Sequence, residues 1–143
     1  MRRTVLAHAL LTVFGGLLAA SSWIIAKHPQ ARELYARVDA WRGSFGVLLL
    51  VWGLFMLIFR YLLALPVFLS APLDMIVYTV TVLADVAIGF LLGYPLLSRW
   101  LLRRHPAAEE RALALRARLH PYQIGLGLTA IASGVLFLFT WLV

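Results

Sequence analysis

Apolar residues form four long runs along the chain, at about residues 4–26, 44–69, 73–98 and 122–143, with charged residues gathered between them. Each run reaches the roughly 20 residues that a helix needs to cross about 30 Å of hydrocarbon. The runs lack the strict alternation of a membrane strand, and inside lipid a helix satisfies its own backbone hydrogen bonds. We therefore predict an all-α integral membrane protein with four transmembrane helices, as a single domain.

The second half of the chain repeats the first. At an offset of 77, residues 4–33 match residues 81–110 with eleven identities in thirty ungapped positions. With four residues inserted in the second copy, the offset becomes 81 and the match continues through Gly46 and Gly127. Internal repetition of this kind indicates that one structural unit occurs twice.

The repeat predicts the organisation of the whole domain, residues 1–143. Two tandem helix–loop–helix repeats occupy residues 1–60 and 81–143, and an apolar hairpin insert occupies residues 61–80. Each copy holds two spans, so both copies have the same orientation in the membrane. Their pseudo-two-fold axis should therefore run along the membrane normal. Pro66 and Pro72, together with Ser70, are expected to break the helices of the insert.

A short interfacial helix is predicted in each charged connection. Pro29 and Pro106 each precede an early glutamate and later arginines, which is the order that the helix dipole favours. Apolar residues recur at helical spacing in both segments, so both helices should lie in the membrane surface. We expect Gly43 and Ser44 to end the first of these helices before the next span begins.

The formal net charge of +7 is distributed unevenly. Ten of the thirteen lysines and arginines lie in the two long connections, and three lie near the opposite ends of the spans. The positive-inside rule then places loops 27–43 and 99–121 in the cytoplasm and both termini outside, in a bacterial-type inner (plasma) membrane. The charge is thus a topology signal and predicts no nucleic-acid partner. Arg2 and Arg3 also resemble the start of a secretory signal, but its cleavage would remove part of the first repeat.

Five arginines of the second connection are candidates for contact with anionic lipid or with an acidic partner loop. The alternative is a solvated helix that only orients the protein. These residues are Arg103, Arg104, Arg111, Arg116 and Arg118.

Glycines within the apolar runs are predicted to lie at helix–helix contacts, because small residues let two backbones approach closely in lipid. Gly89 and Gly93 form a G-x-x-x-G pattern. The predicted packing positions are Gly15, Gly16, Gly46, Gly53, Gly89, Gly93, Gly127 and Gly134.

Three ionisable residues lie within the apolar runs. Inserting such a group into the bilayer costs free energy, so each of them is a candidate functional residue. Counting from the basic connections places His8, Arg60 and Asp85 in the outer leaflet. Arg60 and Asp85 belong to consecutive antiparallel spans, and we predict that they pair. His8 is the repeat counterpart of Asp85 and is a candidate third member. Arg60 snorkelling to the headgroups is the alternative, and the pair can serve either structure or proton transfer.

The sequence contains few of the residues and motifs that catalysis or cofactor binding requires. The chain has no cysteine, which excludes disulfides, thiolate metal sites and cysteine nucleophiles. No nucleotide-binding, zinc-protease or serine-hydrolase motif occurs. His8 and Asp85 are too few for a metal site, and His8 lacks a second histidine at its depth to hold haem. We predict no catalytic residue, metal or cofactor.

These features predict a non-enzymatic accessory, assembly or scaffold subunit of an inner-membrane complex, which contacts other membrane subunits or copies of itself. The alternative is a small oligomeric transporter or channel that uses the Arg60, Asp85 and His8 cluster. A membrane enzyme, or a redox subunit linked to quinone or haem, is a third reading.

Overall fold

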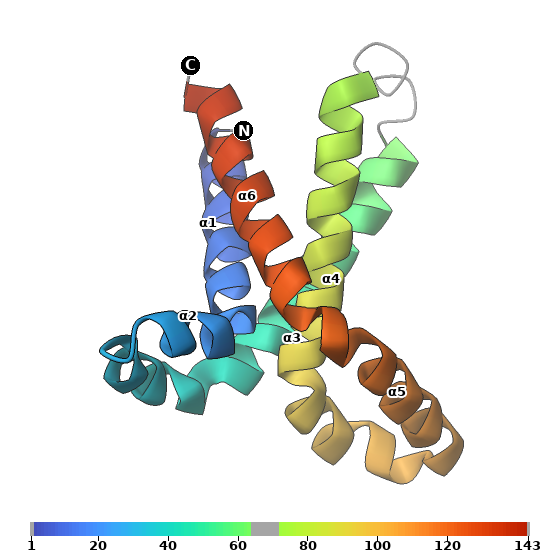
Figure 1. The fold of residues 1–143 in the computed structure, drawn as a ribbon. Coiled ribbons are helices and arrows are strands. Elements are labelled where there is room, and N and C mark those ends of the chain that lie inside the picture. Colours follow the sequence, from blue (N-terminus) through green and yellow to red (C-terminus); the bar gives the residue numbers. More distant parts are fainter. Residues whose placement is uncertain (1, 64–71, 143) are drawn as a thin grey trace.

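The computed structural model describes the backbone of residues 2–63 and 72–142, and within these ranges all regular structure is helical (Figure 1). The α-helices are α1 (Arg2–Ala19), α2 (Ser21–Lys27), α3 (Ala31–Leu63), α4 (Pro72–Trp100), α5 (Pro106–Leu119) and α6 (Gln123–Leu142). Short 3₁₀ turns, η2 (Leu102–Arg104) and η3 (His120–Tyr122), flank α5. The predicted all-α fold is confirmed. The predicted breaks at Pro66 and Ser70 lie outside the described residues, and Pro72 is the first residue of α4.

Several helices are long and apolar enough to cross a membrane. The described part of the chain has three such stretches, Ala31–Phe59, Met75–Trp100 and Pro106–Phe139. A fourth is present if Leu6–Ala19 and Ser21–Lys27, which meet at an angle of 64°, are counted as one bent span. The chain is therefore a multi-pass helical membrane protein.

The helices associate as two closely packed pairs, α3 with α4 and α1 with α6. The pairs meet through contacts of α4 with α6 and of α1 with α3 and α4. In Figure 1 the pairs diverge towards the end where both termini lie. At the opposite end lie α2, the beginning of α3, and α5, so both basic connections are at the same end of the bundle.

Helix α3 runs without interruption through Gly43 and Ser44, so the predicted break at these residues is wrong. A glycine inside a helix costs only about 1 kcal/mol relative to alanine, which packing readily outweighs. Gly43 lies against α4, where an added Cβ would be 3.1 Å from Cδ1 of Leu96. Gly43 is therefore a packing position. At about 1.5 Å per residue, the 33 residues of α3 exceed the hydrocarbon thickness, and its first part runs beside α2.

The first apolar run is bent at Ala20, which leaves the helical region with φ −84° and ψ 7°. Two serines follow, and their hydroxyls compete with the backbone for hydrogen bonds, which lowers helix propensity. The short α2 turns away at this point and contacts α3 and α6. In the other connection Pro106 opens α5, as predicted, with Glu109 in its first turn and Arg116 and Arg118 in its last.

Glycines allow the close approach within each helix pair. A Cβ on Gly127 of α6 would lie 2.7 Å from the carbonyl oxygen of Gly16 on α1. On the other pair, a Cβ on Gly46 of α3 would overlap the backbone nitrogen of Gly93 on α4. Backbone atoms cannot move aside as a flexible side chain can, so neither crossing leaves room for a side chain. Each of the eight glycines predicted as packing positions faces a neighbouring helix, although Gly15 faces only the side chain of Leu49.

Candidate functional site

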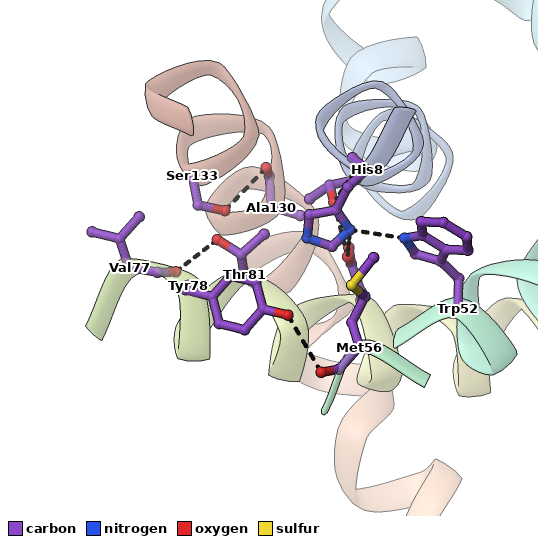
Figure 2. Close-up of polar contacts among 10 residues, drawn as sticks. His8, Trp52, Met56, Val77, Tyr78, Thr81, Ala130 and Ser133 are labelled. Carbon is purple, nitrogen blue, oxygen red and sulfur yellow. Dashed lines mark hydrogen bonds and ion pairs between the residues drawn. The ribbon is translucent and has the colours of Figure 1, made fainter. Parts of the chain in front are cut away.

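Four side chains from three helices, three buried and one half-buried, form a group that we call the polar cluster. Figure 2 labels two of them, His8 and Trp52. His8 and Thr12 come from α1, Trp52 from α3 and Asp85 from α4. Asp85 and Thr12 are fully buried, and His8 is 3% exposed. His8 and Thr12 share a face of α1 because residues four apart lie one above the other. The cluster therefore sits where α1 meets the α3–α4 pair.

The Thr12 hydroxyl joins α1 to α4. It lies 2.8 Å from Oδ2 of Asp85, to which it donates, and 3.0 Å from the carbonyl oxygen of His8 on its own helix. A hydroxyl has one proton to donate and two lone pairs with which to accept. The one Thr12 proton therefore goes to Asp85 or is shared between Asp85 and the His8 carbonyl oxygen. When the carboxyl is ionised, its charge favours donation to Asp85.

The Trp52 indole joins α3 to α1. Its Nε1–H donates to Nδ1 of His8 over 3.0 Å. The indole nitrogen can only donate, so Nδ1 accepts, and a neutral His8 then carries its proton on Nε2. Nδ1 of His8 is also 3.7 Å from Oδ2 of Asp85, longer than a hydrogen bond. This contact becomes an ion pair only if His8 is protonated on Nδ1, which the bond from Trp52 opposes.

Aromatic rings and hydroxyls surround the cluster. The rings of Tyr78 and Phe137 lie 6.2 and 6.1 Å from the His8 ring. The Tyr78 hydroxyl donates to the carbonyl oxygen of Met56 over 3.3 Å and so ties α4 to α3. Thr81 and Ser133 turn their hydroxyls onto their own helices, as Figure 2 shows. The neighbouring polar groups thus serve local or interhelical bonds.

The structure brings two of the three predicted ionisable residues together, His8 and Asp85. The side chain of Arg60 lies outside the described residues, so its pairing with Asp85 stays a prediction. Sequence reasoning did not identify Thr12 and Trp52. Thr12 had a signal, because it lies one helical turn after His8. No feature of the sequence pointed to Trp52, because the spacing of apolar residues does not say which neighbouring helix a side chain contacts.

The side chains of the polar cluster can form hydrogen bonds and exchange protons. Oδ1 of Asp85 is buried and has no hydrogen-bond partner among the described residues. Within the part of the chain that the structure describes, no group of three or more histidine, cysteine, aspartate or glutamate side chains is arranged to hold a metal. The cluster holds one carboxyl group and one imidazole, and the Thr12 hydroxyl bonds to the carboxyl group.

The five predicted lipid- or partner-contacting arginines lie at the other end of the bundle. Arg103 and Arg104 are in the exposed turn η2, and the rest are on α5. The guanidinium of Arg116 stacks over the Tyr94 ring, 4.7 Å from its centroid. Arg111 and Arg118 are exposed. Arg116 is therefore the member of this set that α4 fixes in place.

Fold and site together define a multi-pass α-helical membrane protein with a buried polar cluster between its helices. No protein-family model, curated protein or solved structure matches the chain.

Proposed function

We propose that this protein is a non-enzymatic scaffold or assembly subunit of a bacterial-type inner-membrane complex, built from a duplicated two-helix module. The basic end faces the cytoplasm in this proposal, following the positive-inside rule. The observation that carries the proposal is that the buried polar groups bond between helices and are closed off from the basic end by apolar side chains.

The hydrogen bonds of the polar cluster support a structural role. Thr12 bonds to α4 and Trp52 bonds to α1, so each bond crosses a helix interface. Polar contacts between helices in lipid contribute about 0.6 kcal/mol on average, and they also set the register of packing. The cluster thus holds α1 against the α3–α4 pair.

A layer of apolar residues beneath the cluster argues against a path through the bundle. Ile88 lies one turn beyond Asp85 on α4, and Leu49 lies one turn before Trp52 on α3, which runs in the opposite direction. Both side chains are fully buried, and with Leu18 and Ala130 they belong to one continuous core. Water or a proton leaving the cluster towards the basic end would meet this layer. Among the described residues, this layer interrupts a polar route from the cluster to the basic end within a single copy.

The glycine crossings support the duplicated module. Gly16 and Gly93 correspond at the offset of 77, and Gly127 and Gly46 at the offset of 81. The α1–α6 crossing of Gly16 with Gly127 is thus the counterpart of the α4–α3 crossing of Gly93 with Gly46. A two-fold relation between the copies would exchange the two helix pairs in this manner.

The test is to isolate the protein at its natural expression level in mild detergent and to weigh the intact assemblies. We expect a complex in which the chain occurs at a fixed ratio with other membrane subunits, and which does not assemble when the chain is deleted. Restoring the wild-type chain should restore the complex. A purely symmetric oligomer of this chain, with all other complexes intact after deletion, would contradict the proposal.

A proton-coupled transporter is the second candidate, and it is favoured by Oδ1 of Asp85, which has no hydrogen-bond partner among the described residues. A buried carboxyl oxygen without a partner is costly, and such groups in membrane proteins often bind protons or ions during transport. Four spans enclose little space, so this function would need several copies around a shared path.

Proteoliposomes with an imposed pH gradient test the second candidate. If the chain carries protons, wild-type protein collapses the gradient and Asp85→Asn, which keeps the shape of the side chain, does not. The scaffold proposal expects no flux above that of empty vesicles from either protein.

A further inference from the structure

We propose that a cleft at the basic end of the bundle binds the phosphate headgroup of an anionic phospholipid. The cleft has a volume of about 530 Å³, within the range of roughly 300–1,000 Å³ that is typical of small-molecule sites. It lies among α3, α4, α5 and the start of α6. It is separate from the polar cluster, since it shares no residue with it.

The polar side of the cleft is basic. Arg42 from α3, Arg99 from α4 and Arg116 from α5 line it, together with His120. The only acid in the lining is Asp39, which is 68% exposed and lies 3.6 Å from Arg42. Three arginines against one aspartate leave a positive excess. These three arginines come from three different helices, and guanidinium groups bind phosphate oxygens through paired N–H donors.

Two of these arginines are free to bind an anion. Among the described residues neither Arg99 nor Arg116 makes an ion pair. Arg116 is held by the Tyr94 ring, so it loses little side-chain freedom when it binds. Arg99 is exposed at the last turn of α4, where a cation also complements the helix dipole.

The cleft also has apolar lining residues, which match a lipid and not a free anion. They include Leu91, Leu92 and Leu96 of α4. The nearby Trp100 is 71% exposed at the end of the span, the position of tryptophans in the membrane interface. A phosphate bound to the arginines would leave its glycerol and acyl carbons along the leucines. Basic pockets between transmembrane helices bind headgroups in this manner.

The test measures which lipids stay with the protein. The full chain is placed in nanodiscs of phosphatidylcholine containing a minor fraction of phosphatidylglycerol, and retained lipids are counted by native mass spectrometry after release. The cleft variant is Arg99→Gln with Arg116→Gln. The control is Arg104→Gln with Arg118→Gln, which removes the same charge from exposed positions in the same region outside the cleft.

We expect the cleft variant to lose retained phosphatidylglycerol by roughly tenfold or more, and the control to stay within about twofold of wild type. Equal losses in both variants would show only diffuse attraction to the surface and would overturn the proposal. Millimolar inorganic phosphate should leave the lipid bound. If phosphate displaces it, the cleft is a site for free anions and the lipid assignment is wrong.

A single substitution provides a second test in case the double variant does not fold. Arg99 has an exposed side chain, so Arg99→Gln should leave the helical circular dichroism spectrum unchanged. We expect it to reduce phosphatidylglycerol retention by several-fold, while Arg104→Gln does not. Unchanged retention in folded Arg99→Gln would contradict the proposal.

Discussion

The Trp52 indole and the His8 imidazole are joined across two helices by one hydrogen bond, 3.0 Å from Nε1 to Nδ1. Because the indole nitrogen has no lone pair to offer, the bond selects the histidine tautomer that keeps Nδ1 free of a proton. Nitrogen NMR of histidine-labelled protein at neutral pH should therefore show His8 protonated on Nε2 alone. A signal from the Nδ1–H tautomer would contradict this assignment.

Replacing Trp52 with phenylalanine removes this donor and keeps most of the buried area. We expect the free energy of unfolding to fall by about 0.5–2 kcal/mol, the range of polar contacts between helices in lipid. Thermal denaturation in detergent measures the change. Trp100→Phe is the matched control, because Trp100 is 71% exposed and makes no hydrogen bond with the described residues. Similar losses in both variants would mean that the bond contributes nothing.

Thr12→Val tests the bond between the Thr12 hydroxyl and Asp85. Valine has nearly the same shape, so the change leaves Oδ2 of Asp85 without its donor, at a cost of about 1–3 kcal/mol. Thr129→Val is the control, because the exposed Thr129 hydroxyl also bonds back one turn, to Gly125, and bonds to no other helix among the described residues. The difference between the two variants in thermal stability isolates the bond to Asp85. Equal effects would show that this bond is weak.

Gly127→Ala tests the contact of α1 with α6. The new Cβ would lie 2.7 Å from the carbonyl oxygen of Gly16 and 3.0 Å from the backbone nitrogen of Ala20, so the helices must separate. We expect a loss of about 1–3 kcal/mol in unfolding free energy, as for other overpacked cores. Gly125→Ala lies on the same helix with nothing within 4 Å of its Cβ. It should be neutral or stabilising by up to about 1 kcal/mol.

Gly46→Ala tests the equivalence of the two repeats. Its Cβ would overlap the backbone of Gly93 on α4, as that of Gly127 would overlap Gly16 on α1. If the module is duplicated, the two alanine variants should lose stability to a similar extent. A harmless Gly46→Ala beside a damaging Gly127→Ala would show that the repeats no longer make the same contact.

The orientation of the chain can be read from introduced cysteines, since the natural sequence has none. Ala36→Cys on α3 and Ala107→Cys on α5 lie at exposed positions in the two basic connections. We expect an impermeant thiol reagent to label both only after the membrane is opened, because the basic loops should face the cytoplasm. Labelling of either position on intact cells would reverse the topology.

The sequence predicted the long helices because apolar run length is a direct requirement of the bilayer. It predicted His8 and Asp85 as notable because polarity inside such a run is rare. It did not predict that α3 continues through Gly43, because local breaking tendencies of glycine are weaker than packing against Leu96. It did not identify Trp52, because the rotation of α3 about its axis decides which neighbouring helix the indole meets, and the sequence does not give that rotation. Thr12 was visible only as a neighbour of His8.

The uninterrupted course of α3 has a mechanical consequence. Trp41 lies on the first part of this helix and Trp52 on its later part, with no joint between them. A rod without a hinge transmits tilt along its length. A tilt of the first part of α3 would therefore also move Trp52, whose indole donates to His8.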